Sequence, residues 1–210
     1  MKATGIVRRI DDLGRVVIPK EIRRTLRIRE GAPLEIFTDR EGEIVLKKYS
    51  PIGELGAFSK EYAEALAQAS GHAVYITDRD QVIAASGGMK KESVGKSISQ
   101  ELERVIHSRE QVLSAGDGRK FVRVIQDEDG GGCSQVVCPI LCEGDAIGAV
   151  ILMSKDNRRR LGETEQILAR CAAGFLGRQM EQKERGRLTL LFTREMKAAI
   201  VRDTPPASDL

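Results

Sequence analysis

The sequence contains few of the features on which membrane and secreted proteins depend. It has no tryptophan and an aromatic share of only 4%, so we expect cores built from aliphatic side chains. Its longest apolar runs, such as Ala146 to Met153, are far too short to span a bilayer. The first residues lack the apolar stretch and the small-residue cleavage site of a signal peptide. These absences predict a cytoplasmic protein.

Recognisable catalytic and metal-binding patterns are also missing. We find no phosphate-binding Walker loop, dinucleotide-binding glycine pattern, nucleophile elbow or zinc-protease helix. Cys133, Cys138 and Cys142 are spaced unlike common zinc ligands, and His72 and His107 are expected to be structural or solvated. We therefore expect no catalytic residue, no metal and no cofactor. A metal or redox role for the cysteines is the less favoured alternative.

Positive charge is concentrated in one short segment. The net charge of the 210 residues is only +3, yet residues 1–29 hold nine lysines and arginines against three acidic residues. A local excess of this kind is typical of a surface that contacts phosphate groups. It could also be a solvated helix face, which Arg23, Arg24, Arg27 and Arg29 would fit equally well. Contact with nucleic acid is the interpretation that we favour.

The spacing of apolar residues divides the chain into three regions. Residues 1–50 read as a small β-rich domain whose interior is too small to be stable alone, so we expect a shared core in a dimer. Residues 51–182 show an α/β pattern, and residues 183–210 form a basic extension whose last eight or so residues we expect to be disordered.

The expected elements follow from period-two and period-3.6 patterns and from turn residues. In the first region we expect strands at 5–7, 15–18, 34–38 and 43–48 and a helix at 20–26 that begins after Pro19. In the second we expect helices at about 52–69 and 99–108 and from Glu163 onward, the middle one capped by Ser97. The strands of that region are expected at 73–77, 82–85, 111–113, 120–125, 134–141 and 146–154.

The motifs GIVR, DLGRVVIPKEIRRTL and LEIF, all within residues 1–51, resemble the AbrB family of bacterial transition-state regulators. The residues that follow resemble a GAF domain, as Pro139–Ile140 and the strand around Gly148–Val150 illustrate. The resemblance implies an α+β chain. Its N-terminal domain would be a β-rich dimer of swapped hairpins, and an α/β GAF-like domain would follow.

The resemblance also implies which residues face double-stranded DNA. On this sequence they are Arg8, Arg15, Arg23 and Arg24, with Arg9, Lys2 and Lys20 as neighbours. Arg27 and Arg29 stay undecided. The family's loose, AT-rich targets imply contacts dominated by the DNA backbone and by DNA shape.

The expected function is a sequence-tolerant transcription regulator at the nucleoid, which activates or represses genes during sporulation. The first domain would form a homodimer. The GAF-like domain would bind a small molecule near strands 73–85 and residues 87–97, or would join dimers into a homotetramer through its first and last helices. An antitoxin-like module that binds a protein is the alternative, since swapped-hairpin domains also occur in toxin–antitoxin pairs. An enzyme borne by the GAF-like domain lacks a catalytic constellation.

Overall fold

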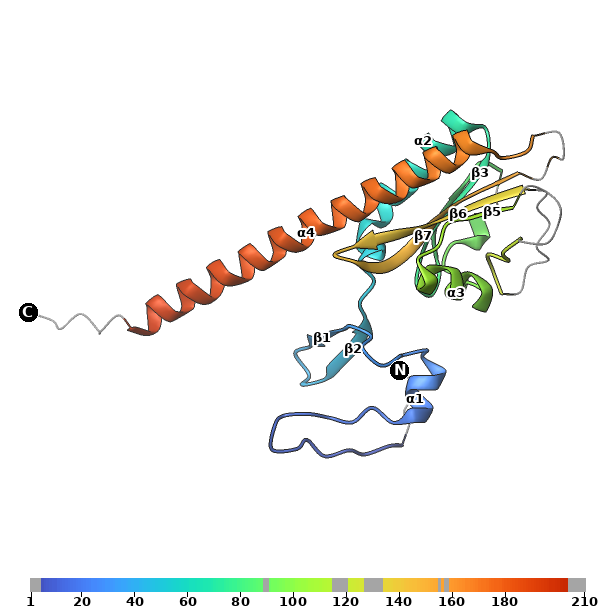
Figure 1. Ribbon diagram of the computed structural model, residues 1–210. Helices are drawn as coiled ribbons and strands as arrows, with labels where there is room; N and C mark the ends of the chain where they lie inside the picture. Colours follow the sequence, from blue (N-terminus) through green and yellow to red (C-terminus); the bar gives the residue numbers. More distant parts are fainter. Residues whose placement is uncertain are drawn as a thin grey trace, which may run out of the picture. The chain divides into compact units, whose positions relative to one another are not determined.

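The computed structural model divides the chain into two compact units. It describes residues 5–88, 91–114, 121–126, 134–154, 156 and 159–203. The N-terminal unit spans Met1–Tyr49 and the C-terminal unit spans Ser50–Leu210 (Figure 1). Lys2, Cys133 and the terminal residues expected to be disordered (204–210) lie outside the described residues.

The N-terminal unit has one short helix and one hairpin. Its elements are α1 (Lys20–Thr25), β1 (Leu34–Thr38) and β2 (Ile44–Lys48). β1 and β2 pair antiparallel, and Leu34 lies opposite Lys48. The turn between them is held by the Asp39 carboxylate, which accepts hydrogen bonds from the N–H groups of Glu41 (3.0 Å) and Glu43 (2.8 Å).

The strands expected at 5–7 and 15–18 are absent from the single chain, and this part of the prediction is wrong for it. Neither segment forms a β-ladder. Their apolar side chains have nothing to pack on, because Val7 is 89% and Val17 71% exposed. A strand without a paired neighbour or a buried face has nothing to hold it in register.

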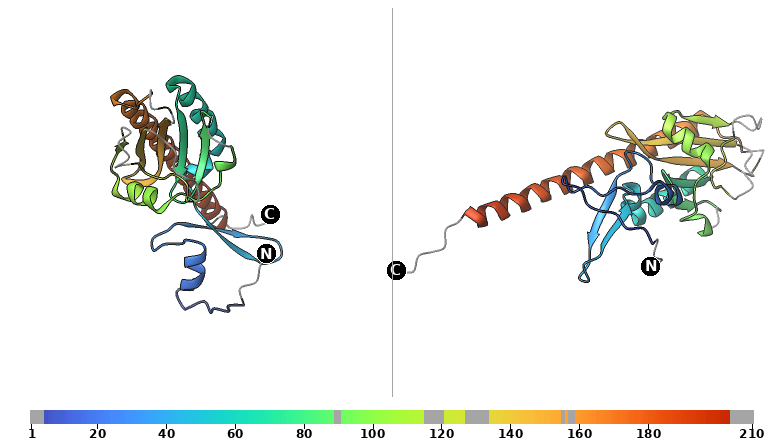
Figure 2. Two further views of the ribbon diagram at one scale, coloured as in Figure 1. Left: turned by 90° about the vertical axis from the view of Figure 1, so that its right-hand side faces the viewer. Right: turned by 90° about the horizontal axis from the view of Figure 1, so that it is seen from below.

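The C-terminal unit is a five-stranded antiparallel sheet with helices on both faces (Figures 1 and 2). The sheet order is β4-β3-β7-β6-β5. The elements, in chain order, are η1 (Ile52–Leu55), α2 (Gly56–Ser70), β3 (Ala73–Asp78), β4 (Val82–Ser86), η2 (Lys91–Ser93), α3 (Gln100–Ser108), β5 (Val112–Ser114), β6 (Ser134–Cys142), β7 (Asp145–Ser154) and α4 (Glu163–Asp203).

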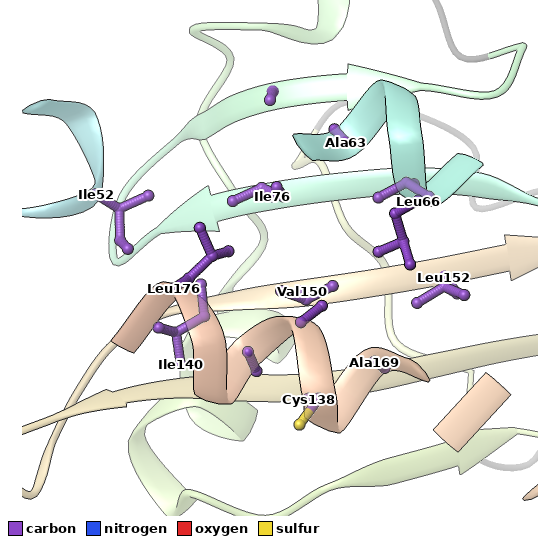
Figure 3. Close-up of a cluster of buried hydrophobic side chains, with 14 of the residues drawn as sticks. Ile52, Ala63, Leu66, Ile76, Cys138, Ile140, Val150, Leu152, Ala169 and Leu176 are labelled. Carbon is purple, nitrogen blue, oxygen red and sulfur yellow. The ribbon is translucent and has the colours of Figure 1, made fainter. Parts of the chain in front are cut away.

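Alternating strand residues supply two separate hydrophobic cores. Val74 and Ile76 of β3 point to the face covered by α2 and α4, whereas Ala73 and Tyr75 point to the face covered by α3. Figure 3 shows the first core, where Leu66 of α2 and the α4 side chains meet the sheet. Because both faces are covered, strands β3, β6 and β7 are buried along almost their whole length.

Helix α3 begins one residue later than the sequence indicated, and its N-cap lies two residues later. Ser99, not Ser97, is the N-cap: its Oγ accepts a hydrogen bond from the N–H of Leu102 at 3.0 Å and donates one to the carbonyl of Arg123. The strand expected at 120–125 is reduced, in its described part, to a single bridge between Ile125 and Ile98.

Helix α4 is far longer than the sheet that it covers. It has 41 residues, which corresponds to roughly 60 Å at 1.5 Å per residue. Residues 183–203 of the basic extension therefore continue this helix. Gly177 lets the helix approach β6 closely, because a Cβ there would collide with the carbonyl oxygen of Leu141. At Gly174, one turn earlier, a Cβ would meet nothing within 4 Å.

Candidate DNA-binding surface

The three basic candidates that follow Pro19 share helix α1. Pro19 suits the start of a helix because its fixed φ matches and it has no N–H to leave unpaired. Lys20, Arg23 and Arg24 are all exposed, and Glu21 is the one acidic residue of the helix. An exposed guanidinium stays charged at any relevant pH and can bridge two phosphate oxygens with its planar fork of donors.

The other described candidates lie on the loop that precedes α1. Arg8 and Arg9 are exposed on its first arm, and Arg15 begins its second arm. The arms meet in a tight turn, closed by hydrogen bonds from the N–H of Asp11 to the carbonyl of Arg15 (3.1 Å) and from Gly14 to Asp11 (3.0 Å). Gly14 takes φ +75°, a left-handed conformation that glycine adopts without strain.

Arg15 differs from the other candidates because it is paired with an acid. Its Nε lies 2.8 Å from Asp11 Oδ2, and its N–H donates to Asp11 Oδ1 at 2.7 Å. The backbone bond and then the guanidinium bond of Arg15 hold the pKa of Asp11 below its ordinary value. This pair was not expected from the sequence, although an aspartate that opens an Asp-Asp-Leu-Gly turn is a typical Asx-turn signal.

The described candidates therefore lie within residues 8–24 and are exposed, whereas Lys2 falls outside the described residues. The undecided Arg27 has φ +52°, rare for a residue with a side chain, and its N–H bonds back to the carbonyl of Arg24 at 3.3 Å. It belongs to the turn that ends α1.

The N-terminal unit has almost no interior of its own. Among residues 5–49, Pro19 alone is buried. Large apolar side chains instead stand in solvent, as Ile36 and Ile44 do at 67% exposure each. A patch of this kind on a soluble protein marks an interaction surface.

In its described part, the expected ligand region of the C-terminal unit includes side chains that belong to the core. Tyr75, Val82 and Ile98, which lie along it, are at most 2% exposed and belong to the core beneath α3. A small polar hollow of about 130 Å³ lies elsewhere, around Arg104 and Arg123.

An aromatic cluster lies where α2 meets α4. Phe58 and Tyr62 of α2 contact Phe175 of α4, with ring centroids 6.0 Å and 5.4 Å from that of Phe175. Phe58 is 37% exposed, and Ile167, nearby on α4 in sequence, is 50% exposed. Burial, together with neighbouring Cys171, raises the pKa of Tyr62. The sequence indicated this surface, because these residues lie on the apolar stripes of the first and last helices of the unit.

The cysteines and the histidine described in the sheet and beside it occupy structural positions. Cys138 and Cys142 are buried in β6, and burial raises the pKa of the Cys138 thiol. His72 Nε2 lies 3.7 Å from Glu165 Oε1. Within the described ranges, no group of three potential ligands is placed to hold a metal ion, and no helix is long and apolar enough to cross a membrane.

Both units match known protein families. A family model for the C-terminal domain of stage V sporulation protein T, a transcription factor, matches residues 54–181. A model for MazE antitoxins (antidote–toxin recognition) matches residues 7–54. The chain is 60% identical to stage V sporulation protein T of Bacillus subtilis (strain 168) over 182 residues, 87% of this chain and 100% of that protein.

Two further comparisons concern the units separately. The chain is 65% identical over 51 residues to the transition state regulatory protein AbrB of the same organism, which is 24% of this chain and 52% of that protein. A GAF domain from an Acinetobacter phosphoenolpyruvate-protein phosphotransferase matches with a TM-score of 0.52 and 17% identity, over 62% of this chain and 84% of that chain. At that identity the likeness shows the fold alone.

An AbrB-like domain followed by a GAF-like domain confirms the predicted fold class. The matches to transcription factors show that the chain is a transcription regulator. The chain belongs to the stage V sporulation protein T family of transcription factors.

Proposed function

We propose that the chain regulates sporulation-stage transcription by binding double-stranded DNA through Arg8, Arg15, Arg23 and Arg24, with Lys2, Arg9 and Lys20 as neighbours. The observation that carries this proposal is the excess of nine basic over three acidic residues in residues 1–29. The described members of the set are exposed on one loop and one helix. Such a surface attracts DNA through its phosphates and needs few base contacts, which suits a sequence-tolerant regulator at the nucleoid.

The DNA-binding form is a homodimer. One chain leaves the apolar residues of the N-terminal unit in water, and a second copy supplies the core that they lack. Two-fold symmetry also doubles the basic set, so that the arginines of both copies face one duplex. The strands that do not form at 5–7 and 15–18 in a single chain would form by pairing within this shared core.

The C-terminal unit joins two such dimers into a homotetramer through the outer face of α2 and α4. Phe58 and Ile167 are exposed there, beside the half-buried Phe175, and aromatic side chains are enriched in interface cores. Binding of a small signal molecule is the other role open to a GAF-like unit, and the hollow near Arg104 is one place where it could bind.

The proposed role needs no chemical step, and we infer that the chain is not an enzyme. An antitoxin-like role is favoured by one observation, the MazE match over residues 7–54. A stretch of 51 residues that is 65% identical to a transition state regulator supports DNA binding equally.

The direct test of the DNA surface is alanine substitution with a matched control. Arg23→Ala and Arg24→Ala each remove a charge from α1, whereas Arg40→Ala removes one from the exposed β1–β2 turn. We expect the first two to weaken DNA binding by roughly three- to tenfold and Arg40→Ala to leave it nearly unchanged. All three should remain dimers in sedimentation. Unchanged affinity at moderate salt would remove Arg23 and Arg24 from the site.

A further inference from the structure

The segment Ser50–Leu55 opens the C-terminal unit immediately after the last residue of the N-terminal unit. The first residue of this segment, Ser50, is held by two hydrogen bonds of its side chain. Ser50 Oγ donates a hydrogen bond to Asp78 Oδ2 at 2.7 Å and accepts one from the N–H of Gly53 at 3.0 Å. The chain is therefore anchored to the C-terminal unit from the residue at which that unit begins.

Asp78 is suited to act as the anchor. It ends β3, is only 5% exposed, and its second oxygen accepts the N–H groups of Asp80 and Gln81 at 2.7 Å each. Both oxygens are thus satisfied, one by the β3–β4 turn and one by Ser50. Hydrogen bonds to an ionised carboxylate are shorter and stronger than those between neutral groups.

The middle of the segment is held by apolar burial. Ile52 is completely buried, in the core formed by the sheet with α2 and α4. In Figure 3 its side chain points toward the region of Ile76 and Leu176. Freeing this segment would expose a full isoleucine side chain, so it is a built part of the unit rather than a loose linker.

The far end of the segment is tied to α4. Lys183 Nζ lies 2.8 Å from Glu54 Oε2 and also donates to the Glu54 carbonyl oxygen at 3.3 Å. The two side chains are 43% and 30% exposed, so this pair is weaker than the Ser50–Asp78 bond. Lys183 lies just past residues 54–181 that the family model matches, at the point where α4 runs on beyond the sheet.

We propose that Ser50–Leu55 is a clasp that couples α4 to DNA binding. When its bonds to Asp78 and Lys183 are formed, the clasp is closed and the start of the C-terminal unit is rigid. When these bonds are broken, the clasp is open and the segment becomes a flexible tether. The inference rests on the proposed function, a homotetramer of DNA-binding dimers, and adds that both N-terminal dimers of one tetramer bind neighbouring sites on one DNA. With the clasp closed, both dimers are held at a high effective concentration for neighbouring sites. Any event that shifts α4, such as docking of a second copy on its outer face, acts on the clasp through Lys183.

The test uses the full chain with Lys183→Gln, Ser50→Ala and the charge-matched control Lys60→Gln on the exposed face of α2. Hydrogen exchange of the Glu54 amide, which donates to the carbonyls of Ser50 and Pro51 at 3.2 Å each, measures the clasp itself. We expect exchange about threefold faster in Lys183→Gln and about tenfold faster in Ser50→Ala, with no change in the control. The swapped pair Glu54→Lys with Lys183→Glu should restore slow exchange in the neighbouring residues.

The coupling between the clasp and DNA binding is measured as the affinity for two DNA duplexes. One duplex accommodates a single N-terminal dimer, and the other is long enough for two. The clasp variants should bind the short duplex like the unaltered chain and the long duplex roughly three- to tenfold more weakly. Equal affinity for the long duplex, despite faster exchange, would overturn the coupling, and unaltered exchange would overturn the clasp. If the unaltered chain binds neither duplex, the proposed function fails, and the coupling fails with it. Exchange then reports on the clasp alone.

Discussion

The two units differ in how much of their apolar surface a single chain can bury. The C-terminal unit packs two cores against opposite faces of one sheet, with residues such as Val150 and Ile151 fully buried. In the described part of the N-terminal unit, residues 5–49, only Pro19 is buried. The same kind of apolar spacing therefore leads to a self-sufficient core in one region and to an incomplete one in the other.

The two regions therefore obtain their hydrophobic stabilisation from different sources. The C-terminal unit obtains its hydrophobic stabilisation from its own residues. The N-terminal unit obtains it from a second copy, so its folding is linked to concentration by mass action. The DNA-binding surface is accordingly a property of a pair of chains.

The largest expected effect concerns the self-sufficient core. Leu152→Ala removes a fully buried side chain from the core shared by the sheet, α2 and α4. We expect the free energy of unfolding of the C-terminal unit to fall by about 2–5 kcal/mol, through lost burial and a residual cavity. Denaturant titration measures this. Leu141→Ala, at a position that is 44% exposed, is the control and should cost far less. Similar losses for both variants would contradict the packing described.

The next effect tests the close approach of α4 to β6. Gly177→Ala places a methyl group against the Leu141 carbonyl oxygen, so the helix must shift. We expect a loss of about 1–3 kcal/mol from such overpacking. Gly174→Ala has open space and should instead stabilise the helix by up to about 1 kcal/mol. A gain in melting temperature for Gly177→Ala would show that α4 does not lie against β6 as described.

A third prediction concerns the incomplete core. Ile36→Ala removes a side chain that is 67% exposed in one chain and that a second copy would cover. We expect the dimer dissociation constant to rise roughly tenfold, equivalent to about 1.4 kcal/mol. Sedimentation over a dilution series measures it, with Glu41→Ala in the exposed β1–β2 turn as control. An unchanged dissociation constant would mean that β1 lies outside the shared core.

The smallest expected effect concerns the paired arginine. Asp11→Asn removes the carboxylate that holds Arg15, whereas Asp12→Asn removes an equal charge from the adjacent exposed residue. Both should tighten DNA binding, and Asp11→Asn should do so by about twofold more because it also releases Arg15. The pKa of Asp11 is lowered, so the difference should persist as pH falls to its ordinary value and vanish only below that. Equal effects of the two variants would show that the pair is irrelevant to DNA binding.

Most elements of the C-terminal unit could be predicted from the sequence because their signals are local. The helix from Glu163 follows an i, i+4 apolar stripe, and the β3 and β7 strands are runs of Val, Ile and Ala between turn residues. For α3, the sequence predicts Ser97 as the N-cap, whereas the structure has Ser99. Two serines two residues apart give the same local capping pattern. Only the hydrogen bonds to Leu102 and Arg123 distinguish them.

Features that depend on distant residues could not be predicted. Residues 5–7 and 15–18 have the residue pattern of strands, but a single chain offers them no neighbouring strand with which to pair. The clasp joins Ser50 to Asp78 and Glu54 to Lys183, pairs separated by long stretches of sequence. Of the DNA-binding surface, charge density alone indicated the segment, and the resemblance supplied the individual arginines. The Asp11–Arg15 pair was within reach of local turn chemistry.

The most direct test of the central claim, that DNA binds to a dimer through these arginines, is the salt dependence of DNA affinity. Two chains bring eight arginines to one duplex, and neutralising six to eight phosphates predicts a slope of log K against log salt of roughly −5 to −7. A single chain with four arginines could reach only about −4. A slope in the predicted range supports a two-chain surface, and a slope of about −4 or shallower would contradict it.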